Sequence, residues 1–138
     1  MRNRSIVALA MVPALCFLAA CDEDETTGET GHTPNEAVIT VDGLPVDTLR
    51  LTQAGTTRVV IKFYHDGELL EDIEVDHHTR LTFTPPTLAT EAAVAGANFS
   101  RDVTGDAVAG TLGTVMVGYG HDEAADEEEF GPFDVKID

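Results

Sequence analysis

The stretch that decides the fold is Arg58-Val59-Val60-Ile61-Lys62-Phe63-Tyr64-His65-Asp66-Gly67. Val59, Ile61 and Phe63 recur at every second position, which is the period of a strand with one buried face. Asp-Gly is a strong signal for a tight hairpin turn, because it supplies the positive φ that such a turn requires. We therefore expect a strand with Arg58, Lys62 and Tyr64 on its outer face, ending in a turn at Asp66-Gly67.

The same period of two recurs on both sides of this strand. Further strands are expected over residues 37–41, 49–51, 69–75, 81–84, 114–119 and 133–138. Pro85-Pro86 stops the strand that contains Phe83. Residues 88–99 are rich in alanine and are compatible with one helical turn. Many short strands with turns between them, over about 100 residues, predict one all-β domain over 36–138, an antiparallel β-sandwich.

Several segments also share an order and spacing with a known family. They are Gly55-Thr56-Thr57-Arg58-Val59-Val60-Ile61, Asp66-Gly67, Leu81-Thr82-Phe83-Thr84, Pro86-Thr87-Leu88-Ala89-Thr90, Val103-Thr104-Gly105, Ala109-Gly110-Thr111 and Thr114-Val115. Together they resemble the bacterial immunoglobulin-like domain of group 2. The resemblance implies an immunoglobulin-like sandwich, and a non-catalytic module of the kind found on surface and adhesion-type proteins.

The chain departs from that family in three places. The stretch from Gly67 to Leu81 is longer than the family pattern and contains Asp76-His77-His78. Glu91 stands where a core valine is usual. The run from His121 to Glu129 is unusually long and acidic. These departures affect the middle strands and one loop more than they affect the sandwich.

The N-terminal residues read as an export signal with a lipid attachment site. Arg2 and Arg4 precede an apolar run over residues 6–18, which is too short to span a bilayer comfortably. The run ends in Leu18-Ala19-Ala20-Cys21, which resembles the lipobox of bacterial lipoproteins. We expect residues 1–20 to be removed as a signal peptide. A lipid on Cys21 would then anchor the protein to a membrane of the cell envelope, outside the cytoplasm.

Residues 21–35 are polar and acidic, and we expect them to form a disordered tether. An acid directly after the lipidated cysteine resembles the inner-membrane retention signal of some enteric bacteria. The run Asp22-Glu23-Asp24-Glu25 also resembles a surface-export signal of lipoproteins in another bacterial group. The two resemblances lead to different destinations, so the sequence leaves the final membrane and leaflet open.

Charge and cysteine content restrict the function further. The net charge is −17, and residues 1–20 hold two arginines and no acid, so the remainder carries −19. A surface of that sign repels nucleic acid. Cys16 lies in the signal, so Cys21 is the single cysteine of the mature chain. An internal disulfide is therefore not expected, and burial of apolar side chains must hold the fold.

Two groups of side chains are candidates for holding a divalent cation. The candidate ligands are His65, His77, His78, His121, Asp122 and Asp126. Imidazole and carboxylate groups suit zinc or copper, but the spacing fits no compact metal motif. His77 and His78 would point to opposite faces of a strand. The carboxylates of the run 121–129 could bind calcium, but they lack the regular ligand spacing of a calcium loop, so the simpler interpretation is a solvated charge run.

The sequence does not predict an enzyme. Ser100 is the only serine after residue 20, and neither a nucleophile elbow nor a phosphate-binding loop occurs. We therefore expect a lipid-anchored, non-catalytic binding or structural module of adhesion type. It would act without a cofactor on an unidentified envelope or surface partner. The alternative is an envelope lipoprotein that binds a divalent metal through the histidines or the acidic run.

Overall fold

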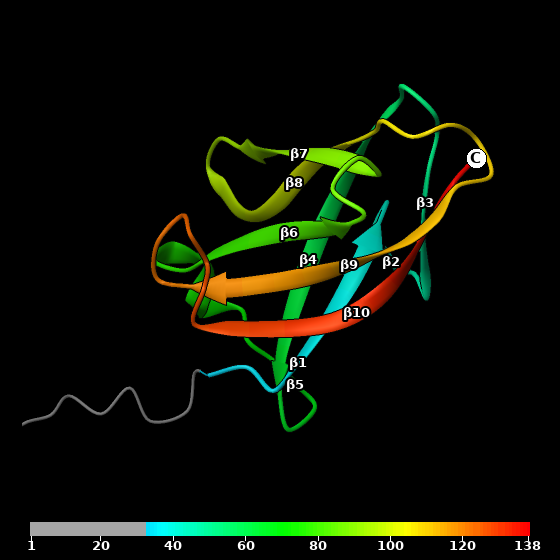
Figure 1. The fold of residues 1–138 in the computed structure, drawn as a ribbon. Helices are drawn as coiled ribbons and strands as arrows, with labels where there is room; N and C mark the ends of the chain where they lie inside the picture. The colour runs from blue at the N-terminus through cyan, green and yellow to red at the C-terminus, as the bar shows by residue number, and fades with distance from the viewer. Residues whose placement is uncertain (1–32) are drawn as a thin grey trace, which may run out of the picture.

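The computed structural model describes residues 33–138 as a sandwich of two β-sheets (Figure 1). The elements are β1 (Glu36–Val41), β2 (Leu44–Pro45), β3 (Thr48–Leu51), β4 (Thr56–His65), β5 (Glu68–Leu69), the 3-10 helix η1 (Asp72–Val75), β6 (His78–Thr84), β7 (Ala89–Val94), β8 (Ala97–Gly105), β9 (Leu112–Gly120) and β10 (Glu128–Ile137). This confirms the all-β sandwich. Within these residues no helix is both long enough and apolar enough to cross a membrane.

One sheet has the strand order β2-β1-β4-β8-β7, with β5 also paired to β4, and the other has the order β3-β10-β9-β6. All pairs but one are antiparallel. The exception is β3, which runs parallel to β10 with Leu49 opposite Val135 and Leu51 opposite Ile137. The expectation of a purely antiparallel sandwich is therefore wrong at this edge. The parallel pair places four fully buried aliphatic side chains in the same core.

The inward faces of the strands meet in an aromatic and aliphatic core. Val59, Ile61 and Phe63 are all buried, as the alternation predicts. The Phe63 ring lies edge-on to two other rings, with centroid distances of 4.8 Å to Phe99 and 4.9 Å to Tyr119. These edge-to-face contacts bring rings from both sheets together, since β4 and β8 belong to one sheet and β9 to the other.

The predicted turn after the central strand is confirmed. Asp66 and Gly67 both have positive φ, at 49° and 83°, and connect β4 to β5. The strand expected over 69–75 is wrong. Only Glu68–Leu69 pairs with β4, and the chain then forms η1. Ile73 is buried but Val75 is 88% exposed, so the apparent alternation is not that of a strand.

The alanine-rich stretch is strand and not helix. Residues 89–94 form β7, which pairs with β8, and the turn between them includes Gly96 with a φ of 75°. The sequence did not predict β8, a nine-residue strand that lies between β4 and β7 in its sheet. Helix propensity is a weak preference that pairing within a sheet overrides. The last strand begins at Glu128, so two residues of the expected acidic loop belong to β10.

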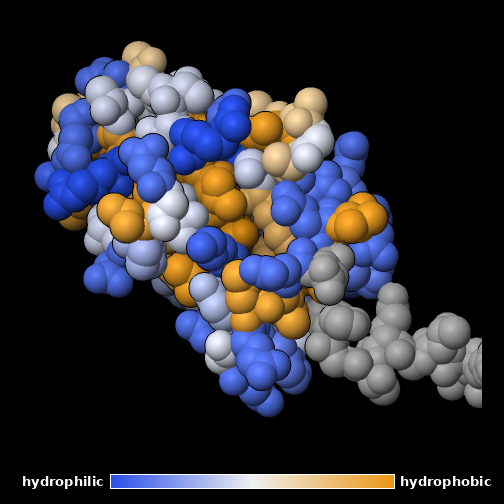
Figure 2. All heavy atoms as spheres, turned by 180° about the vertical axis from the view of Figure 1, so that it is seen from behind, coloured by the Kyte–Doolittle hydropathy of each residue, from blue (hydrophilic) through white to orange (hydrophobic). Residues whose placement is uncertain are grey.

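The surface agrees with the acidic composition. Figure 2 shows the face opposite to that of Figure 1, where hydrophilic residues predominate and hydrophobic ones form separate patches. The large hydrophobic residues that are exposed within residues 33–138 are Leu44, Leu69, Val75, Val108 and Leu112. They come from several different strands and loops. Single exposed apolar residues of this kind are ordinary on folded proteins.

Candidate functional site

The four histidines of residues 33–138 gather at one end of the sandwich, which we call the histidine end. His65 closes β4, His121 follows β9, and His77 and His78 lie at the start of β6. β6 starts where β9 ends, since His78 pairs with Gly120. The chain also enters β1 here, because the Asn35 amide donates to the carbonyl of Tyr64 at 2.9 Å. His65 Nδ1 lies 2.7 Å from the carbonyl oxygen of Thr33.

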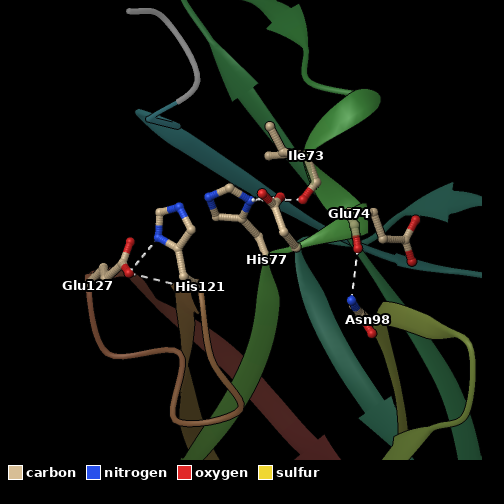
Figure 3. Close-up of polar contacts among 7 residues, drawn as sticks. Ile73, Glu74, His77, Asn98, His121 and Glu127 are labelled. Atoms are coloured by element: carbon tan, nitrogen blue, oxygen red, sulfur yellow. Dashed lines mark hydrogen bonds and ion pairs between the residues drawn. The ribbon is translucent and has the colours of Figure 1, made fainter. Parts of the chain in front are cut away.

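His77 is the buried member of this group. Its Nδ1 lies 2.9 Å from the carbonyl oxygen of Ile73 and 2.8 Å from Oδ1 of Asp76 (Figure 3). A carbonyl oxygen can only accept, so Nδ1 carries the proton. The ring stacks on Tyr119 with centroids 4.8 Å apart and planes inclined by 12°. These contacts fix the orientation of the imidazole between η1 and β9.

His121 packs against His77 and joins it to the acidic run. The two ring centroids are 3.9 Å apart. One carboxylate oxygen of Glu127 lies 2.7 Å from His121 Nδ1 and accepts the His121 backbone N–H at 3.1 Å (Figure 3). The side-chain hydrogen bond from His121 is the main reason that the pKa of Glu127 lies below its ordinary value. The histidine pair therefore connects η1 with the loop between β9 and β10.

The acidic loop is folded against β9 and is more than a solvated charge run. Ala125 is fully buried with a φ of 46°. It packs against Gly118 and Gly120, and a Cβ at Gly118 would lie only 2.4 Å from the Ala125 carbonyl oxygen. The Glu127 amide donates to the carbonyl of Tyr119 at 3.0 Å. Most of the acidic side chains nevertheless point into solvent.

The structure brings only some of the predicted ligands together. His77 and His121 touch, but His65 lies beside Asp66, its ring nitrogen 3.7 Å from that carboxylate. Asp122 Oδ1 accepts the amide of Ala124 at 2.8 Å, which is a structural contact within the loop. Two further candidates stay apart from the histidine pair: His78 lines a groove beside β6, and Asp126 is exposed.

Residues 33–138 contain no group of three or more histidine, cysteine, aspartate or glutamate side chains that could hold a metal ion. Cys21 and the predicted signal peptide and lipobox lie outside the described residues, as does nearly all of the predicted tether.

Sequence reasoning missed a buried charged pair beside the histidine end. Arg101 on β8 and Glu91 on β7 are both largely buried, with Nε and Oε2 2.9 Å apart. The other carboxylate oxygen of Glu91 accepts the amide of Leu81 on β6 at 3.2 Å. The available signal was Glu91 itself, an acid at a position where the family resemblance expects valine. The pair links the edge of one sheet to the edge of the other.

Comparison with known proteins supplies no relative for this chain. No protein-family model, no curated protein and no solved structure matches it. The immunoglobulin-like resemblance therefore stays a prediction from the residues that carry it.

Proposed function

We propose that the protein is a lipid-anchored, extracytoplasmic binding or structural module of adhesion type, without catalytic activity, held at the cell envelope by a lipid on Cys21. The observation that carries this proposal is the order of a basic start, an apolar run and Leu18-Ala19-Ala20-Cys21 ahead of a β-sandwich. Lipid transfer at a membrane face requires a cysteine thiol that follows an apolar segment and small residues, as Cys21 does here. More than one acyl chain makes such an anchor durable.

The way the chain enters the sandwich shows where a tether from Cys21 would join it. β1 begins at the histidine end, next to Asp66 and the β4–β5 turn, so the tether would meet the domain at this end (Figure 1). Acidic side chains are concentrated here, on the β4–β5 turn and the loop over 121–127. Anionic lipid headgroups repel such a surface. Charge would therefore keep the domain off the bilayer and leave the opposite end accessible to a partner.

The anchor is tested by metabolic labelling with a fatty acid. The wild-type protein should take up label and sediment with membranes, whereas Cys21→Ser should do neither. Cys16→Ser is the matched control, because the predicted signal peptide that contains it is removed, and the mature protein should label normally. Label retained in Cys21→Ser would contradict the proposal. Equal loss of label in both variants would mean that the site of lipid attachment is assigned wrongly.

A further inference from the structure

A groove of 480 Å³ lies between β6 and the hairpin formed by β7 and β8. Its polar lining residues are His78, Arg80, Glu91, Asn98, Arg101 and Glu123. Figure 1 shows the hairpin lying beside β6, and the bond from the Leu81 amide to Glu91 holds the two together. The volume falls in the range of sites that hold small organic ligands.

Arg101 is the first reason to expect a ligand in this groove. Its side chain is only 7% exposed, yet within residues 33–138 its guanidinium contacts a single acceptor, the carboxylate of Glu91. Even there, Nε and Oε2 are close without forming a well-aligned hydrogen bond. The buried nitrogen Nε faces Glu91, whereas the two terminal nitrogens have no acceptor within residues 33–138 and are open to the groove. A guanidinium has five N–H donors, so the terminal ones are available to an acceptor that enters the groove.

Arg80 provides a second guanidinium in the same groove. Arg50 and Arg58 each pair with an aspartate, but no carboxylate of the described chain lies within ion-pair distance of Arg80. This is notable in a chain with a net charge of −17, because acidic partners are abundant. Asn98 is held in place at the groove, since its Nδ2 donates to the carbonyl of Glu74 at 2.8 Å (Figure 3).

The charges in the groove restrict the ligand class. Glu91 largely neutralises Arg101, and Glu123 adds a further negative charge to the lining. These two acids repel a doubly charged anion about twice as strongly as a single carboxylate, so the smaller charge is favoured. A planar carboxylate also matches the fork of a guanidinium. Three further lining residues, Ala93, Val94 and Ala95, offer an apolar surface to a short aliphatic group.

We propose that this groove binds a small molecule through a single carboxylate, which receives hydrogen bonds from Arg101 and Arg80. The inference rests on the proposed binding role and names its ligand class. It does not depend on the lipid anchor, so failure of the labelling experiment and failure of the binding experiment are distinguishable.

The test is a titration of the full chain, isotope-labelled and held in detergent micelles, with propionate as the probe. The expected result is saturable shifts of the amide signals of Arg80, Ala93 and Gly96 and of the Arg101 Nε–H signal. A probe this small should bind with a Kd in the millimolar range, about 1–10 mM. Propionamide has the same shape without the charge and should cause no saturable shift. Inorganic phosphate should bind more weakly than propionate.

Arg80→Gln is the decisive variant, because Arg80 is partly exposed and its loss should leave the fold intact. It should weaken propionate binding at least tenfold. Arg50→Gln removes an arginine that pairs with Asp138 at the opposite end and should leave binding unchanged. Three results would each overturn the proposal: propionamide binding as tightly as propionate, phosphate binding more tightly, or equal weakening in both arginine variants.

Discussion

The buried pair of Glu91 and Arg101 should stabilise the junction between the two sheets only while both partners are present. A double-mutant cycle with Glu91→Leu, Arg101→Met and the double variant tests this. The two side chains are 19% and 7% exposed, and their charged atoms lie 2.9 Å apart. Leucine and methionine have similar volumes to the residues they replace, so the cycle changes charge more than packing.

The magnitudes follow from which charge is left behind. Removing one partner of a buried ion pair costs about 3–5 kcal/mol, because the other charge remains buried without compensation. Arg101→Met leaves Glu91, which keeps the Leu81 amide and some contact with water, so a loss of about 3 kcal/mol is expected. Glu91→Leu leaves a more deeply buried guanidinium, and about 4 kcal/mol is expected. The double variant should lose only about 1 kcal/mol, for the unpaired Leu81 N–H.

The assay is urea unfolding at equilibrium, with the midpoint compared at constant m-value. The double variant should therefore unfold at a higher urea concentration than either single variant. Arg58→Met, which breaks the exposed pair with Asp102, is the control and should have little effect because water screens that pair. If the two single variants each lost less than about 1 kcal/mol and their effects added, the pair would not hold the sheets together.

Four further predictions concern the core and the loop. Phe63→Ala should destabilise the fold by about 4 kcal/mol in urea unfolding, since the ring is fully buried among other aromatic rings; a loss of a few tenths would mean that the core lies elsewhere. Gly118→Ala should displace the acidic loop, because the new Cβ would clash with the Ala125 carbonyl oxygen. Hydrogen exchange at the Glu127 amide, which donates to Tyr119, should then accelerate. An unchanged exchange rate at that amide would contradict the packing of the loop on β9. Because the pKa of Glu127 is lowered in the folded protein, its bond to His121 stabilises the fold above pH 4.5, and this stabilisation is lost as the pH falls through the folded-state pKa. In Glu127→Gln the free energy of unfolding should therefore vary less with pH over that acidic range. A pH profile identical to that of the wild type would refute this. Calcium and sodium salts of equal ionic strength should shift the melting temperature alike, whereas a calcium-specific rise of several degrees would reveal a site in 121–129.

The sequence by itself determined the inward faces of several strands. Val59, Ile61 and Phe63 were assigned to one buried face by alternation alone and are buried, and the strand expected over 114–119 is present with Val115, Val117 and Tyr119 buried. The Asp66-Gly67 turn could equally be predicted from the sequence, because these two residue types readily adopt the positive φ that the turn requires. Such features depend on residues that are close together in the sequence, so the local sequence pattern is enough to predict them.

The remaining features were decided by contacts between segments far apart in the chain. Residues 89–94 show no period-two pattern of large apolar side chains, so only pairing with β8 makes them a strand. The parallel pairing of β3 with β10 joins residues nearly 90 positions apart, and nothing in either segment specifies it.

The candidate sites show the same division. The sequence identified His77, His121 and Glu91 as unusual, but the ring contact of the two histidines arises only because the segments before β6 and after β9 end side by side. The partner of Glu91 could not be predicted, since Arg101 lies in a strand that the sequence did not reveal. A charged side chain can be recognised from its type, but whether it is buried, and what neutralises it, depends on the elements that the tertiary fold packs around it.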